Sequence, residues 1–261
     1  MINETVGSLI ISGSGSAGGG VYDAVKISGS GKITGNVECN EFHISGSGKI
    51  VGNVKASSFK TSGSSRINGD LKAETIKISG SLDIAGDVKS KQIKVSGAAH
   101  IEKSLSCGEV SISGSIHIDE SLHGEHVKIS GGINIKGDCE TEEFIARGTF
   151  QIGGLLNAGN IEIGVGGFCS AKEIGGERIE VRELAYSAIW NKIISMFSSH
   201  NAGLTTNIIE GDDIYLEYTT AKIVRGNNIT IGRGCVIDTA EYKGKLDVIN
   251  GGRVGNEVKV A

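Results

Sequence analysis

The sequence predicts an all-β fold, a parallel β-helix (solenoid) built from 17-residue coils, and three observations lead to this prediction. Residues 27–162 form eight consecutive units of 17 residues without an insertion or deletion. Within each unit apolar residues alternate with Ser, Lys and Thr, which is the period of half-buried strands and not the 3.6-residue period of helices. Proline is absent, as expected for interior strands that are hydrogen-bonded on both sides.

Four columns of the aligned units hold the residues that we expect to form the core. Three of them begin at Ile27, Val37 and Phe42 and contain mainly aliphatic residues or Phe. A coil of three short strands, each with one or two inward side chains, accommodates this pattern, and coils would stack about 4.8 Å apart. The most regular column contains isoleucine in every unit: Ile33, Ile50, Ile67, Ile84, Ile101, Ile118, Ile135 and Ile152.

Glycine columns mark the corners of the predicted coils. One glycine column precedes Asn or Asp, a turn signal at a fixed corner; it contains Gly35, Gly52, Gly69, Gly86 and Gly137. A second column indicates a bend in a narrow coil or a close approach of two backbones; it contains Gly29, Gly46, Gly63, Gly80, Gly97, Gly114 and Gly131.

The repeat predicts a main stack of coils over residues 1–183, an insertion over 184–206, and C-terminal coils of the same solenoid over 207–261. The strand pattern returns after the insertion, because three apolar pairs repeat at intervals of 15 and then 17 residues. These pairs are Ile214/Leu216, Ile229/Ile231 and Leu246/Val248.

The insertion contains a segment, residues 184–199, that predicts an amphipathic helix. Its polar side carries a single cation, Lys192. Three interpretations remain open: the helix packs on its own solenoid, lies on a membrane surface, or docks a protein partner. Its apolar arc contains Tyr186, Ile189, Trp190, Ile193, Ile194, Met196 and Phe197.

Composition argues against several classes of protein. Hydrophobic residues make up 38% of the 261-residue chain and recur regularly, which disfavours disorder. The chain has a net charge of −4, whereas nucleic-acid binding needs a basic surface, so we expect no nucleic-acid partner. The first five residues lack the features of a secretory signal and no apolar run approaches the ~18 residues of a membrane span. We therefore expect a cytoplasmic protein, with membrane association through the helix left open.

No constellation of residues predicts catalysis, a cofactor or a metal site. Most of the five cysteines are expected to be buried free thiols, and no C-x-x-C pair is present. His100 and His117 share an outward column with Asp83, a combination that could bind a divalent metal. Because Lys32 and Lys49 occupy the same column, we interpret it as a solvated face. We expect no enzymatic activity, since the eight regular units have no long loop to carry a catalytic group.

The ends of the coil stack are the candidate polymerisation surfaces. A terminal coil exposes unpaired strand backbones and a cross-section of the aliphatic core, and no capping segment is evident. The candidate residues are Val6, Leu9, Ile11, Val21 and Val25 at one end, and Leu246, Val248, Val254, Val258 and Val260 at the other.

Two stretches resemble a known family. The repeats ISGSGKITGNV (27–37) and ISGSGKIVGNV (44–54) look like bactofilins, the polymer-forming cytoskeletal proteins of bacteria, and residues 209–242 resemble the longer Bacillus-type members. This resemblance implies a right-handed, three-sided β-helix that self-assembles end to end into nucleotide-independent filaments. It also implies a structural scaffold for cell-shape, envelope or motility machinery. The alternative is a non-polymerising solenoid adaptor that binds a protein partner or a membrane through its helix.

Overall fold

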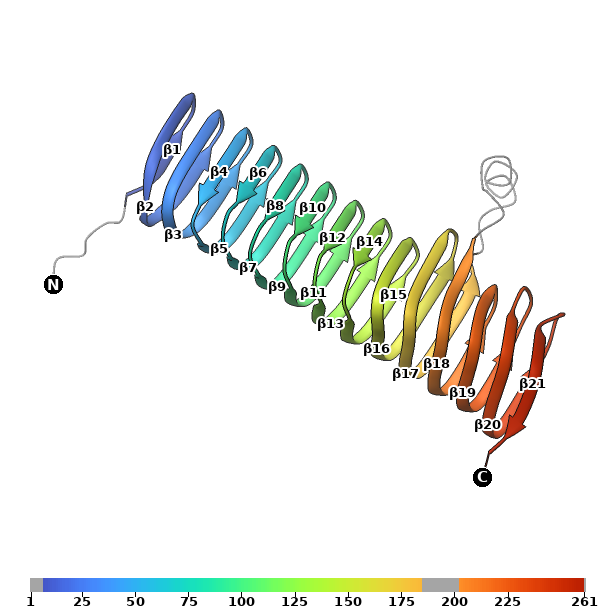
Figure 1. The fold of residues 1–261 in the computed structure, drawn as a ribbon. Coiled ribbons are helices and arrows are strands. Elements are labelled where there is room, and N and C mark those ends of the chain that lie inside the picture. Colours follow the sequence, from blue (N-terminus) through green and yellow to red (C-terminus); the bar gives the residue numbers. More distant parts are fainter. Residues whose placement is uncertain (1–6, 185–201, 261) are drawn as a thin grey trace, which may run out of the picture. The chain divides into compact units, whose positions relative to one another are not determined.

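The computed structural model describes residues 7–184 and 202–260, and all regular secondary structure within these ranges is β-strand (Figure 1). The prediction of an all-β parallel solenoid is confirmed. The predicted helix lies outside the described residues, apart from Leu184 at its start, and remains a prediction. In the described part of the chain we find no helix with the length and apolarity of a membrane span.

Contacts divide the chain into two units, residues 1–125 and 126–261, and strand β13 (Leu122–Ile129) runs across the boundary. The strands of unit 1 are β1 (Leu9–Ile11), β2 (Ser14–Ile27), β3 (Ser30–Ile44), β4 (Ser47–Val51), β5 (Val54–Thr61), β6 (Ser64–Ile67), β7 (Leu71–Ile78), β8 (Ser81–Ile84), β9 (Val88–Val95), β10 (Ala98–Ile101), β11 (Leu105–Ile112) and β12 (Ser115–Ile118). Those of unit 2 are β14 (Gly132–Ile135), β15 (Cys139–Ala146), β16 (Thr149–Val165), β17 (Phe168–Glu183), β18 (Gly203–Leu216), β19 (Thr219–Ile231), β20 (Val236–Val248) and β21 (Arg253–Lys259).

Strands in unit 1 pair in parallel with their equivalents one repeat away, so identical columns stack on one another. Ile33 pairs with Ile50, and the line continues through Ile67, Ile84, Ile101 and Ile118. Each of these side chains is fully buried. The interior isoleucine line predicted from the repeat is therefore confirmed in this unit.

One coil, made of β4 and β5, shows how the core is enclosed. Its buried residues form three pairs, Gly48/Ile50, Val54/Ala56 and Phe59/Thr61. Alternation breaks at Gly52–Asn53, at Ser57–Ser58, and again after Thr61. Three inward pairs separated by three corners are what a three-sided coil requires. The right hand implied by the resemblance stays a prediction.

Both glycine columns have a structural cause. At the Gly-Asn/Asp corner, Asn53 N donates to Asn36 Oδ1 and Asp70 N donates to Asn53 Oδ1, each at 2.9 Å. Side chains thus satisfy backbone donors where the strand ladder is interrupted. In the second column a Cβ added at Gly97 would lie 2.0 Å from the carbonyl oxygen of Gly80. Close backbone approach, and not a left-handed conformation, requires glycine there.

Unit 2 is also a stack of parallel strands, but the number of residues between paired positions varies from one coil to the next. The predicted spacing of its last coils is confirmed, because Ile214 pairs with Ile229 and Ile229 pairs with Leu246. Between β17 and β18 the register instead jumps by 35 residues, from Phe168 to Gly203. The extra residues lie within the predicted insertion, residues 184–206, whose last four residues already belong to β18.

Candidate functional site: the ends of the coil stack

The N-terminal end lies in unit 1, where β1 forms the start of the first described coil. Leu9 pairs with Val25 and Ile11 pairs with Ile27, so both side chains end interior columns. Ile11 is buried and Leu9 is half-buried. Their role in a polymerisation surface stays a prediction, and Val6 lies outside the described residues.

The side chain of Val21 points outward and does not end an interior column. It pairs with Glu38, whose side chain points outward, and its own side chain is 64% exposed. The next residue, Tyr22, pairs with the buried Cys39 and thus occupies the interior column. The Tyr22 hydroxyl donates to the carbonyl oxygen of Gly18 at 3.0 Å. Counting back 17 residues from Cys39 would have identified Tyr22 in the sequence.

The C-terminal end lies in unit 2, where β21 covers only part of β20. Val254 pairs with the buried Ile237. Leu246 and Val248 continue the columns of Ile229 and Ile231, and the side chain of Val248 is 41% exposed because no described strand covers it. Val258 instead pairs with Glu241, in a line of polar residues. Leu246, Val248 and Val254 therefore occupy core columns, whereas Val258 occupies a lateral one.

Both ends leave strand backbone without a ladder partner among the described residues. β1 pairs with only the last three residues of β2, Val25–Ile27. At the other end β21 pairs with Val236–Tyr242 and leaves the outer edge of residues 245–248 of β20 open. Open edges of this kind are the standard template for adding another strand.

Comparisons with known proteins agree with this architecture. Residues 3–88 match the family model described as "Bactofilin: Polymer-forming cytoskeletal". Residues 3–88, about a third of the chain, are thus similar to the bactofilin family. The resemblance seen in the glycine and isoleucine repeats is thereby confirmed, and the family described is structural and cytoskeletal.

Two curated relatives come from Bacillus subtilis (strain 168). The chain is 42% identical over 95 residues to "Uncharacterized protein YhbF" and 38% identical over 94 residues to "Uncharacterized protein YhbE". Each match covers 36% of this chain and 37% or 38% of the relative, so only about a third of either protein is compared. No solved structure matches.

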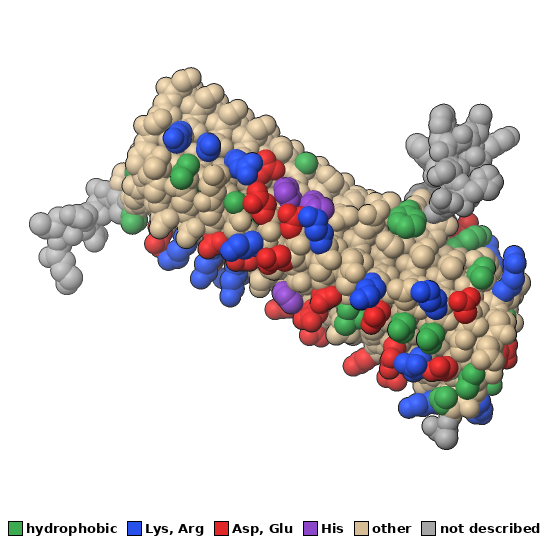
Figure 2. All heavy atoms as spheres, in the orientation of Figure 1, with side chains coloured by type: hydrophobic (Ala, Val, Ile, Leu, Met, Phe, Trp, Pro, Cys, Tyr) green, Lys and Arg blue, Asp and Glu red, His purple; other side chains and the backbone are tan. Residues whose placement is uncertain are grey.

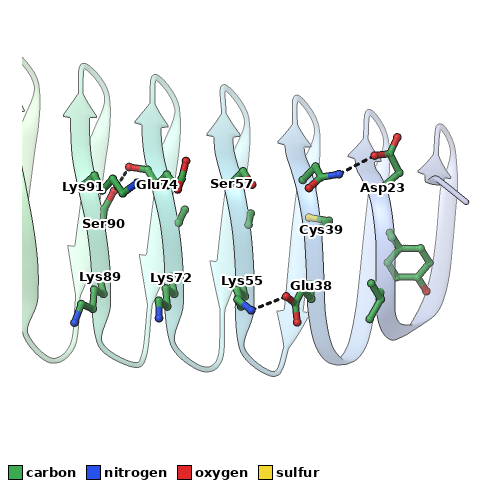
Figure 3. Close-up of a pocket in the computed structure, with 15 residues that line it drawn as sticks. Asp23, Glu38, Cys39, Lys55, Ser57, Lys72, Glu74, Lys89, Ser90 and Lys91 are labelled. Carbon is green, nitrogen blue, oxygen red and sulfur yellow. Dashed lines mark hydrogen bonds and ion pairs between the residues drawn. The ribbon is translucent and has the colours of Figure 1, made fainter. Parts of the chain in front are cut away.

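A groove in unit 1 carries a line of lysines. Figure 3 shows Lys55, Lys72 and Lys89 on successive coils, in line with Glu38. Small residues at the next inward positions, including Ala56, leave the hollow beside the lysines. Lys55 forms an ion pair with Glu38 at 2.5 Å, whereas Lys72 and Lys89 have no ion-pair partner among the described residues.

The outward histidine column contains a feature that the sequence analysis missed. As predicted, His100 pairs with both Asp83 and His117 in the strand register. The carboxylate that contacts both imidazoles is nevertheless Asp119, not Asp83. Asp119 lies two residues after His117, and this spacing places two side chains on one face of a strand. The two-residue spacing in the sequence could therefore have identified Asp119 as a neighbour of His117.

A polar cluster surrounds the root of the predicted insertion in unit 2. Glu217 is 8% exposed, and its carboxylate accepts hydrogen bonds from Glu183 N at 2.9 Å and from the Tyr215 hydroxyl at 3.1 Å. Burial, followed by the hydrogen bond to Glu217, raises the pKa of Tyr215. Arg233 forms an ion pair with Glu183 at 2.7 Å. These contacts fix the end of β17, and no repeat pattern indicates them.

Proposed function

We propose that the chain is a structural scaffold protein of the cytoplasm that self-assembles end to end into nucleotide-independent filaments. The observation that carries this proposal is that, among the described residues, apolar core columns and unpaired strand edges terminate together at each end of the coil stack. Stacking of one end on another would bury Leu9, Leu246 and Val248 and continue the parallel ladder. Because repetition of such a contact does not close, it produces a filament. Such filaments would support cell shape, the cell envelope or motility machinery.

Assembly is tested by sedimentation and negative-stain microscopy of the purified chain. We expect filaments from the wild type, and much shorter or no filaments from Val248→Lys and Leu9→Lys, because either change places a charge at a core column end. Val236→Lys is a matched control: Val236 lies on the same strand as Val248 and is 44% exposed, but in an outward column. Val21→Lys asks separately whether the outward Val21 belongs to the assembly surface.

Two outcomes would contradict assembly through the ends of the coil stack. A wild type that remains monomeric at high protein concentration and moderate salt would remove the filament proposal. Equal loss of filaments in Val248→Lys and Val236→Lys would show that general surface charge, and not the end surface, governs assembly.

The second candidate function is a non-polymerising adaptor. Lys72 and Lys89, which have no ion-pair partner in the described part of the chain, favour it, since a groove with like charges on successive coils attracts an acidic segment of a partner. The predicted helix over residues 184–199 offers a second contact, with a protein or a membrane surface. Sedimentation as a monomer, together with partner capture that is lost in Lys72→Glu/Lys89→Glu, would support the adaptor.

A further inference from the structure

Two imidazoles and one carboxylate converge on the outward surface of unit 1. His100 Nε2 lies 3.1 Å from Asp119 Oδ2, and His117 Nε2 lies 2.9 Å from Asp119 Oδ1. The two rings are tilted by 49° with their centroids 5.1 Å apart. Figure 2 shows histidine side chains beside acidic ones on the face that it displays.

The backbone holds all three residues in place. His100 on β10 and His117 on β12 are direct partners in the parallel ladder. Asp119 follows β12, and its N–H donates to the carbonyl oxygen of Ile101 at 2.9 Å. Ile101 and Ile118, the neighbours of the two histidines, are fully buried in the core. A rigid ladder therefore presents three side chains whose arrangement requires little ordering on binding.

The spacing of the donor atoms suits a transition-metal ion. One candidate donor atom from each of the three residues lies within 4.8 Å of the others. Bonds of about 2.1 Å in tetrahedral geometry require donor atoms roughly 3.4 Å apart. Small side-chain rotations would therefore bring both imidazoles and one carboxylate oxygen onto a common ion. In the described residues this is the one group of three such side chains with this spacing.

The chemistry of the donors narrows the class of ion. Imidazole nitrogen favours Zn²⁺, Co²⁺, Ni²⁺ and Cu²⁺ over Ca²⁺ and Mg²⁺, which prefer all-oxygen sites. Both histidine side chains are 38% exposed and that of Asp119 is 24% exposed, so water can occupy the remaining coordination positions. We propose that His100, His117 and Asp119 form a binding site for a divalent transition-metal ion of the Zn²⁺ class, linking two adjacent coils.

A hydrogen-bonded His–Asp–His cluster without metal is the competing explanation. It would require no ion, because hydrogen bonds alone would hold the three side chains together. Metal binding differs in a measurable way, because the ion displaces the proton from each Nε2 and gives a spectroscopic signature when Co²⁺ is used.

Titration of the untagged full-length chain with Zn²⁺ and Co²⁺ tests the site. Isothermal calorimetry at neutral pH should give one Zn²⁺ per chain, and Co²⁺ should produce visible ligand-field bands that Zn²⁺ abolishes. Asp119→Asn and either His→Asn change should each weaken binding by at least about tenfold. The double variant His100→Asn/His117→Asn should lose it. His43→Asn is the matched control, because His43 is an outward histidine in the same unit, on β3.

Folding is verified separately by circular dichroism, and all three altered side chains are partly exposed, so each variant should remain folded. Zn²⁺ should also raise the midpoint of thermal unfolding in the wild type and in His43→Asn but not in the double variant. Absence of Co²⁺ bands in the wild type, or binding by the double variant equal to that of the wild type, would overturn the proposal and leave the hydrogen-bonded cluster.

Discussion

The side chains of the five cysteines show what burial in a narrow coil does to a titratable group. All five are free and buried. Burial raises the pKa of Cys39, Cys107 and Cys169 to about 11 and that of Cys139 to about 12, because the thiolate loses its hydration inside the coil. At neutral pH the thiols are therefore protonated, poor nucleophiles and poor metal ligands.

Cys139 gives a prediction for the dependence of stability on pH. Its thiol has a pKa of 9.0 in an ordinary environment and about 12 in the folded chain. Between these values the unfolded chain loses the proton and the folded chain keeps it, so the contribution of Cys139 to stability is constant below pH 9 and falls as pH rises toward 12. The contribution of Cys139 is roughly 1.4 kcal/mol per pH unit.

Guanidinium unfolding of the wild type and of Cys139→Ala, at several pH values across this window, measures the effect. The variant is expected to be less stable overall but to lose less stability per pH unit. Parallel curves for the two proteins would mean that the Cys139 thiol does not contribute.

Individual side chains also show where sequence reasoning reaches its limit. The buried isoleucine line follows from the repeat alone, because each member fills the same place in the core. Thr61 departs from this rule, since it occupies an interior column and is 2% exposed. Its hydroxyl lies 2.8 Å from that of Ser65, which is 7% exposed. The two deviations from the repeat satisfy each other, a pairing that the columns alone do not indicate.

At the scale of the elements, stability depends on how closely successive corners stack. Ser96 N and Ala98 N donate to carbonyl oxygens of the preceding coil at 2.8 and 2.9 Å. Gly97 lies between these bonds, and its Cα therefore faces the backbone of Gly80 directly. A side chain at this position would separate the coils and lengthen both hydrogen bonds.

We therefore expect Gly97→Ala to lower the free energy of unfolding by at least about 2 kcal/mol. The new Cβ would lie 2.0 Å from a backbone oxygen, which cannot rotate away as a side chain could. Gly18→Ala is the control in the same unit, because a Cβ there meets nothing within 4 Å; it should cost less than about 0.5 kcal/mol. Denaturant unfolding of both variants gives the comparison, and similar losses would contradict the stacking explanation.

The elements were predictable to different degrees. Corners and strands of the regular repeat follow from spacing, because each coil meets an identical neighbour. Tyr22 and Asp119 could have been found by extending the columns and by the two-residue period. The hydrogen bond between Glu183 and Glu217 could not have been predicted in this way. It joins residues 34 apart in the sequence, at a point where the repeat length is irregular.

At the scale of the whole molecule, the predicted insertion between β17 and β18 is the candidate for contact with a membrane or a protein partner. Leu184 N donates to the carbonyl oxygen of Val165 at 3.2 Å, and Gly203 N donates to that of Gly167 at 3.2 Å. The chain thus leaves the coil and rejoins it at neighbouring points of one corner. Phe168, beside that corner, is 44% exposed.

Flotation and unfolding of variants test the role of the predicted helix over residues 184–199. If the predicted helix lies on a membrane, the wild type should float with anionic liposomes, and Trp190→Glu/Phe197→Glu should not, because two carboxylates would enter the apolar arc. Ser195→Glu/Ser198→Glu adds the same charge on the predicted polar side and should still float if apolar contact dominates. If no version floats and Trp190→Glu/Phe197→Glu is less stable toward denaturant, the apolar arc packs on the solenoid itself. Loss of flotation in both double variants would mean that net charge, and not the apolar arc, governs membrane binding. That outcome would contradict a membrane contact through an amphipathic helix.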